Sequence, residues 1–444
     1  MSGVWKMEGL HRLRWILIFE ALFAGVYVSL TRGLFVIYLA SLRQSVEEIS
    51  FVVLASSTAS FVVGVLIYKK PSFITRDVKL KLVFFHALER VIWLLMPLTA
   101  TGLLIFLLYA TCLVSSSIIS IFLAFAIYGS LDEDMIRDVT AKRSAANGIS
   151  SILGFALGVF LLAFLTSEAK FSYIFPFGAL LGLISTLLLG FLDLSHLEGK
   201  QFPKATEQPE KIFSTSTFFV ILMASSNLMG LIWAPYVMNY LGGPDFLAAS
   251  MNLAGTISSV AASLYWRKRT FKTLRISLAL NTLGPAIILA TPWPHIHPAI
   301  NVYTSFTFTG ANFLGTFLFA RYNKWFGAVK SSVLLAVLGS LAQLTAASMG
   351  MFAKQNFMVG FSMALAVKAA ATVIALIIIP EVAVVPEDVA RTYSQVLYNT
   401  SLTGYRMSVE ISKETILTTL RLLALSLVIV ALYLIYRVLW ILIG

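Results

Sequence analysis

Five ionisable side chains lie within long apolar stretches of this chain: Glu20, Arg32, Glu89, Arg90 and Lys368. An ionisable group inside a bilayer costs about 2.5–3.5 kcal/mol on insertion scales, so each of these side chains is a candidate functional site. Their three cations and two carboxylates leave a net charge of +1. An anionic ligand, or a carboxylate group on a larger ligand, would complement that charge.

Glu20 and Arg32 share the first apolar stretch but are too far apart to pair. The twelve residues between them span about 18 Å of helix. One hypothesis is that Arg32 acts on the charge of a ligand while Glu20 takes up and releases a proton. The alternative is that Glu20 reaches the membrane interface or pairs with a cation of a loop. His86 lies one helical turn before Glu89 and is either part of a proton relay or a core histidine with satisfied hydrogen bonds.

The elements that must position these residues are membrane-spanning helices. Of the 444 residues, 58% are hydrophobic and only 12% are charged, whereas a soluble protein has about 25% charged residues. Each stretch has about the 20 residues that a span needs, and lipid offers backbone groups no partners, so every span is expected to be helical. We expect an all-α, multi-pass protein of the cell membrane. The twelve expected spans are 13–40, 49–67, 80–98, 102–128, 148–166, 172–192, 213–241, 246–266, 276–291, 299–320, 331–352 and 357–379.

The basic residues of the loops predict the orientation. Loops on the side of the N-terminus hold 22 Lys and Arg residues, whereas the opposite loops hold only Arg43, Lys170 and Lys354. Basic loops stay on the cytoplasmic side, so a cytoplasmic N-terminus is expected. The net charge of +12 is concentrated in these loops, which argues against nucleic acid as a partner. Cys112 is the only cysteine, so no intramolecular disulfide forms.

A polar segment at 193–212 divides the spans six and six. This predicts two six-helix bundles, 1–192 and 213–379, joined by a cytoplasmic loop, as in a transporter built from repeats. We expect 380–444 to add an extramembrane segment, to 414, and a thirteenth span whose end, Gly444, is external. The alternative for 415–443 is a helix on the membrane surface.

Loop motifs carry a resemblance to the major facilitator superfamily. Gly64 matches the first glycine of that family's motif between spans 2 and 3, Lys69 stands at its arginine, and Tyr68 replaces its aspartate. The segment from Ala141 to Gly148, with Arg143, is similar to the loop before span 5. The gating residues implied on these loops are Gly64, Lys69, Asp134, Arg143 and Arg267.

The resemblance also ranks the candidate residues. It implies that spans 1, 4, 7 and 10 line a central cavity, whereas spans 3 and 12 are more peripheral. Glu20 and Arg32 then become the better site candidates, and Glu89, Arg90 and Lys368 become secondary ones with structural roles. The uncharged candidates on the lining spans are Ser116, Asn227 and Asn312.

The function expected is secondary transport of a small solute by alternating access, by a monomer without a cofactor or metal. No nucleotide-binding motif occurs in a polar loop, so an ion gradient, with protons as one candidate, or the solute's own gradient would drive transport. Two alternatives stay open. The acidic loop from Asp132 to Asp138 could hold magnesium in a prenyl or diphosphate transferase. The chain could also be a membrane platform that binds a partner through 380–444.

Overall fold

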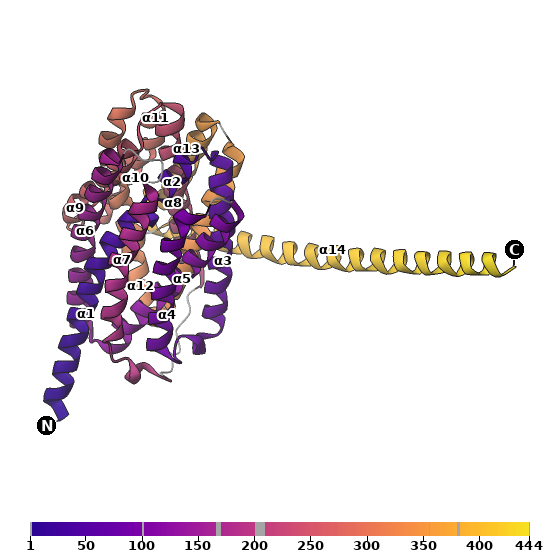
Figure 1. Ribbon diagram of the computed structural model, residues 1–444, viewed down its shortest axis with the longest axis horizontal. Helices are drawn as coiled ribbons and strands as arrows, with labels where there is room; N and C mark the ends of the chain where they lie inside the picture. The colour runs from indigo at the N-terminus through magenta and orange to yellow at the C-terminus, as the bar shows by residue number, and fades with distance from the viewer. Residues whose placement is uncertain are drawn as a thin grey trace.

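The computed structural model describes residues 2–99, 102–165, 170–199, 209–354, 356–379 and 382–443, which contain helices and no strand. The long helices lie side by side in one bundle, and the last helix leaves it (Figure 1). The α-helices are α1 (Ser2–Leu30), α2 (Phe35–Ser41), α3 (Val46–Lys69), α4 (Val78–Leu95), α5 (Gly102–Ser130), α6 (Glu133–Phe164), α7 (Phe171–Gly190), α8 (Pro209–Pro235), α9 (Asp245–Trp266), α10 (Phe271–Thr282), α11 (Gly284–Leu289), α12 (His297–Ala353), α13 (Phe357–Ile378) and α14 (Glu387–Ile443).

Nine helices within the described ranges are long and apolar enough to cross a membrane. The remaining three expected spans are also helical. Helix α4, which covers most of 80–98, carries Lys79, Lys81, Glu89 and Arg90, which lower its hydropathy. The span at 276–291 is a shorter apolar segment, and that at 299–320 is the first part of α12, which bends where Gly327 has a φ of 71°.

The first expected span, 13–40, is not one continuous helix, which corrects the sequence-based boundary. Helix α1 ends at Leu30, a 3-10 turn follows at Arg32–Leu34, and α2 then begins. The backbone at Thr31 leaves the helical region, with φ −114° and ψ −91°. The carbonyl oxygen of Gly33 accepts a hydrogen bond from Asn252 Nδ2 on α9 at 2.9 Å. The tertiary contact therefore satisfies a backbone group that the break sets free.

Two further spans are also interrupted. The span at 276–291 consists of α10 and α11, and Pro285 stands at the beginning of α11, where a missing N–H costs nothing. Helix α8 passes at Pro235 into a π-helical turn, Tyr236–Tyr240. Single π-turns of this kind occur frequently at functional sites.

Contacts between loops agree with the expectation that successive loops lie alternately on the two faces of the bundle. On the face with the basic loops, here the basic face, Arg14 pairs with Asp138. On the same face, the Glu198 carboxylate accepts from the backbone N–H of Asp77 and Val78 at 2.9 and 2.8 Å. On the opposite face, Lys170 Nζ lies 2.5 Å from Asp245 Oδ2. That the basic face is cytoplasmic stays a prediction.

Helix α14 is continuous from Glu387 to Ile443, so no break separates an extramembrane segment from a later span. It projects away from the bundle as the long yellow helix in Figure 1. Its first part is anchored on α8, where Ser394 and Ser214 share a hydrogen bond. The side chains of Arg421 and Arg437, together with Gly444, lie outside the described part of the chain, and the thirteenth span stays a prediction.

Candidate functional site

Two cavities border the break in the first span. The Arg32 cavity has a volume of about 430 Å³ and lies mainly between α1, α4, α5 and α6. The Lys368 cavity has a volume of about 310 Å³ and lies mainly between α8, α9, α12 and α13. Arg32 lines the first and its neighbour Gly33 lines the second, so both cavities reach the 3-10 turn. The charged or titratable residues of the Arg32 cavity are Glu20, Arg32, His86, Glu89, Arg90 and Arg143.

Glu20 is buried in the Arg32 cavity and held by two partners. Arg143 donates to Glu20 Oε2 at 2.6 Å and also to the backbone oxygen of Leu17 at 3.0 Å. His86 Nε2 lies 3.5 Å from the other carboxylate oxygen. Glu20 thus pairs with a cation of the loop before span 5, and its role in taking up a proton stays a prediction. This is the geometry of the alternative interpretation.

Glu89 and Arg90 neutralise each other one turn further along α4. Arg90 Nη1 donates to Glu89 Oε2 at 2.7 Å, and the Arg90 guanidinium lies 4.4 Å from the centre of the Tyr27 ring. His86 joins both pairs, since its Nε2 is 3.0 Å from Arg90 Nη2. Its Nδ1 is 2.7 Å from the Thr186 hydroxyl. Among the described residues, no group of three or more His, Cys, Asp or Glu side chains could hold a metal ion.

Arg32 differs from the other arginines of its cavity because it has no carboxylate partner. Its guanidinium donates to the Ser116 hydroxyl on α5. Within the described ranges, no carboxylate lies at ion-pair distance from it. Arg32 therefore brings a positive charge into the cavity that no described acidic side chain holds in an ion pair, although Glu89 acts on it at longer range.

Lys368 brings a basic side chain without a carboxylate partner into the other cavity. It is only 3% exposed, and its Nζ donates to Asn281 Oδ1 at 2.6 Å. Asn281 is held by its amide group, which donates to Thr304 and Thr307 at 3.2 Å each. No carboxylate in the described part of the chain pairs with Lys368. Within the described structure Lys368 thus makes one hydrogen bond, to the fixed amide of Asn281, and its remaining N–H groups can donate to a ligand in the cavity.

The Arg32 cavity is open toward the basic face and closed toward the other. Ser120, Thr140, Ser144 and Asn147 line it and are exposed. On the opposite face, one core cluster joins Tyr27 and Trp93 of the first half to Trp233 and Phe361 of the second half. The Lys170–Asp245 ion pair and the bond from Arg43 to Asn239, 3.4 Å, also join the two halves there.

The remaining sequence-predicted residues lie away from this charge cluster. Asn227 on α8 and Asn312 on α12 are half-buried and line neither of the two cavities. Gly64 lies at a close crossing of α3 and α12, where an added Cβ would come within 2.9 Å of Val337 Cγ2. Lys69, Asp134 and Arg267 are exposed on the basic face.

The structure places the secondary candidates beside the cavities. Glu89 and Arg90 on α4 and Lys368 on α13 line them, although spans 3 and 12 were expected to be peripheral. Arg143, expected to be a gating residue of a loop, reaches Glu20. The sequence held one signal for the contact between Arg143 and Glu20, because a buried carboxylate requires a cationic or hydrogen-bonding partner. Which of these residues serve a site stays a prediction.

No protein-family model and no curated protein matches the sequence. A bacterial homologue of the iron transporter ferroportin, in its inward-facing state, is similar in structure with a TM-score of 0.64 and 14% identity, over 82% of this chain and 98% of that chain. An outward-facing structure of such a homologue is similar with a TM-score of 0.56 and 12% identity, again over 82% of this chain and 98% of that chain. The nucleoside transporter NupG is similar with a TM-score of 0.57 and 14% identity, over 82% of this chain and 96% of that chain. The chain therefore has the fold of a multi-pass membrane transporter.

Proposed function

We propose that this protein is a secondary transporter of the major facilitator superfamily that moves a small anionic solute across the cell membrane by alternating access. The observation that carries the proposal is a pair of basic side chains, the half-buried Arg32 and the buried Lys368, that line adjoining cavities without a carboxylate partner. A positive charge held away from water without an ion-pair partner is costly, so such a site gains most from a negatively charged ligand.

The solute site lies at the 3-10 turn Arg32–Leu34, where the two cavities adjoin. The first span of each proposed half is interrupted, at Thr31 in one and after Pro235 in the other. Interrupted spans at corresponding places in two halves are typical of transporter binding sites, because they free backbone groups and side chains toward a cavity. Asn301 and Ser305, which line the Lys368 cavity, supply further polar groups for the solute.

Transport requires the proposed bundles 1–192 and 213–379 to rock about this site. The present structure has its cavity open toward the basic face, which is the inward face if that face is cytoplasmic. The higher TM-score with an inward-facing structure, 0.64 against 0.56, supports this assignment. Opening the other side requires separation of Lys170 from Asp245 and of Asn252 from Gly33.

The coupling site in this proposal is Glu20 together with His86. Uptake of a proton by Glu20 requires that its ion pair with Arg143, which links α1 to α6, opens first. The carboxylate thus senses the side to which the cavity is open, while Arg32 acts on the solute. Glu20→Gln should abolish accumulation driven by a pH gradient in proteoliposomes but leave solute exchange intact. Full accumulation by Glu20→Gln would exclude the proton role.

The solute class is tested by ligand-induced thermal stabilisation of the purified protein. The panel contains organic anions, amino acids, sugars, nucleosides and organic cations. We expect stabilisation by one or more anions, and its loss in Arg32→Gln and in Lys368→Gln. Lys79→Gln, which removes an exposed cation of the basic face that lines neither cavity, is the matched control and should respond as the parent does. Stabilisation only by neutral or cationic solutes would overturn the anion site.

A further inference from the structure

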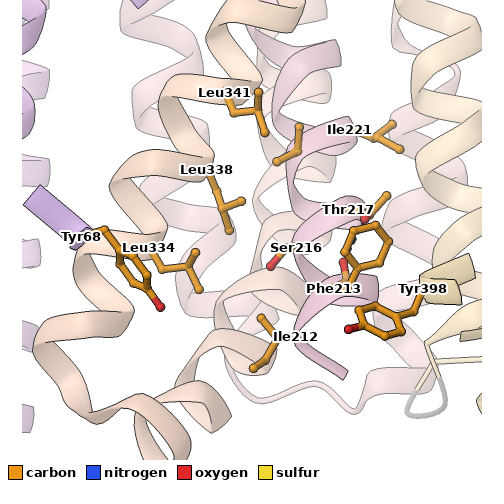
Figure 2. Close-up of a pocket in the computed structure, with 11 residues that line it drawn as sticks. Tyr68, Ile212, Phe213, Ser216, Thr217, Ile221, Leu334, Leu338, Leu341 and Tyr398 are labelled. Carbon is orange, nitrogen blue, oxygen red and sulfur yellow. Dashed lines mark hydrogen bonds between the residues drawn. The ribbon is translucent and has the colours of Figure 1, made fainter. Parts of the chain in front are cut away.

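A third cavity, separate from the two at the broken helix, forms an apolar groove of about 510 Å³ on the side of the bundle. Leu334, Leu338 and Leu341 line it from one face of α12, and Ile212 and Ile221 line it from α8. Figure 2 shows these side chains facing one another, with Tyr68 at the end of α3 and Tyr398 on α14 completing the walls. Here this cavity is called the leucine groove.

One polar group faces the leucine groove and has no protein partner. The Ser216 hydroxyl is hidden from solvent, and within the described structure it makes no hydrogen bond. Figure 2 shows it pointing toward the leucines of α12. A buried hydroxyl without a partner costs free energy, which a ligand that offers an acceptor would recover. Thr217 on the next position is already satisfied, since its hydroxyl donates to the Phe213 carbonyl at 2.9 Å.

Cations are concentrated at the basic-face end of the leucine groove. Tyr68 is followed directly by Lys69 and Lys70, both exposed. Lys330 precedes Leu334 by one helical turn, about 6 Å along α12. The groove therefore has an apolar body that starts at a positively charged mouth, with one hydrogen-bond donor between them.

We propose that the leucine groove binds one anionic phospholipid. An acyl chain lies along the leucines, the Ser216 hydroxyl donates to an ester carbonyl, and Lys69 and Lys70 contact the headgroup. A phospholipid has an apolar chain, then an ester acceptor, then an anionic headgroup. The groove offers leucines, then the Ser216 hydroxyl, then lysines, in the same order. Lysines next to an apolar surface at the membrane boundary favour anionic over zwitterionic lipid, by about fivefold in affinity for each lysine.

The location also suggests what the lipid does. Tyr68 and α3 belong to the first half, whereas α8, α12 and α14 follow the central segment, so the groove crosses between the halves. A headgroup at Lys69 and Lys70 would reduce the repulsion between basic loops of the two halves. The lipid thereby occupies a place where the halves move against each other.

The test is native mass spectrometry of the protein in detergent with added phosphatidylglycerol or phosphatidylcholine. The parent should retain one phosphatidylglycerol at activation energies that remove phosphatidylcholine. Leu338→Trp and Leu341→Trp, which fill the groove, should each lose it. Lys69→Gln with Lys70→Gln should lower retention about 25-fold, toward the level of phosphatidylcholine. Ser216→Ala should lower retention of both lipids to a similar extent.

Matched controls lie outside the groove. Leu80→Trp changes an exposed leucine on α4, and Lys268→Gln with Arg269→Gln removes two cations from another basic loop. Both should retain phosphatidylglycerol as the parent does. Equal retention of the two lipids by the parent, or unchanged retention in both tryptophan variants, would overturn the proposal. Displacement of the lipid by glycerol phosphate alone would show a headgroup ion site without an acyl chain, and would also overturn it.

Discussion

Glu20 on α1 and Arg143 on α6 form an ion pair with an N–O distance of 2.6 Å, although 123 residues separate them in sequence. The pair closes one wall of the Arg32 cavity and fixes the basic-face end of α1 against α6. His86 contacts the same carboxylate from α4, so three helices meet at one buried acid. The charge of Glu20 is thereby satisfied within the protein, and Arg32 is left for a ligand.

Removing the cation of this pair should destabilise the protein. Arg143→Ala leaves the Glu20 carboxylate, 2% exposed, without its ion-pair partner. Breaking a buried pair in this way costs about 3 kcal/mol. The free energy of unfolding, measured by titration with a denaturing detergent, should fall by that amount. Arg143→Gln combined with Glu20→Gln should recover much of the loss, because neither charge then remains buried alone.

The matched control is the neighbouring cation. Lys142 pairs with Asp138 at 2.9 Å, but its side chain is 52% exposed. Exposed ion pairs contribute at most about 1 kcal/mol, so Lys142→Ala should have little effect on the unfolding free energy. Equal losses for Arg143→Ala and Lys142→Ala would contradict a special role for the Glu20 pair.

Gly64 should be required by the close crossing of α3 and α12. Gly64→Leu places a side chain where even a Cβ would approach Val337 Cγ2 to 2.9 Å. Overpacking of this kind costs about 1–3 kcal/mol, and Val337→Ala should relieve part of it. Gly339→Leu on α12 is the control, because a Cβ there would find no atom within 4 Å. Unfolding in denaturing detergent distinguishes the three variants.

The Lys170–Asp245 pair should hold the face opposite the basic loops closed. Asp245→Asn removes the pair and, at about 1 kcal/mol, should shift the ratio of conformations about fivefold away from the present one. A cysteine at Ser144, in a background with Cys112→Ser, should then react more slowly with an impermeant maleimide applied from the basic face. Exchanging the charges, with Lys170→Asp and Asp245→Lys, should restore the rate. An unchanged rate in Asp245→Asn would exclude this gate.

Reporter fusions test the orientation. A reporter within 193–212 should be cytoplasmic, and one within 291–298 should be external. A reporter at Gly444 should be external and one near Asn399 cytoplasmic if 415–443 forms a thirteenth span. Two reporters of the first pair on the same side would refute the twelve-span arrangement, and a cytoplasmic Gly444 would remove the thirteenth span.

The helices followed from the sequence because they depend on a local property. Apolar length is a sum over neighbouring residues, and helices cover the expected spans in the structure. The sidedness, which rests on the basic loops, stays a prediction. The break at Thr31 was not predictable in this way. Thr31, Arg32 and Gly33 interrupt the apolar run there, but a spanning helix can carry such residues without a break. The break depends on a bond from Asn252, which lies 219 residues away.

The candidate site was predicted in part. Inserting charges into a membrane is costly wherever they occur, so Glu20, Arg32, Glu89, Arg90 and Lys368 were found by type alone. Their partners required the tertiary structure, since Arg143 and Asn281 come from other helices. The sequence therefore identified the candidate charges without separating those in ion pairs from those without a carboxylate partner, and the proposal of an anionic solute rests on that separation.

Uptake of labelled solutes into proteoliposomes tests most directly whether the protein moves anions, whether or not protons travel with them. Uptake of one or more small organic anions is expected, with none of neutral or cationic solutes under the same gradients. Arg32→Gln should abolish this uptake while retaining the folded, monodisperse state of the parent. Uptake of neutral or cationic solutes only, or anion uptake of parental size in Arg32→Gln, would show that Arg32 does not serve an anion site.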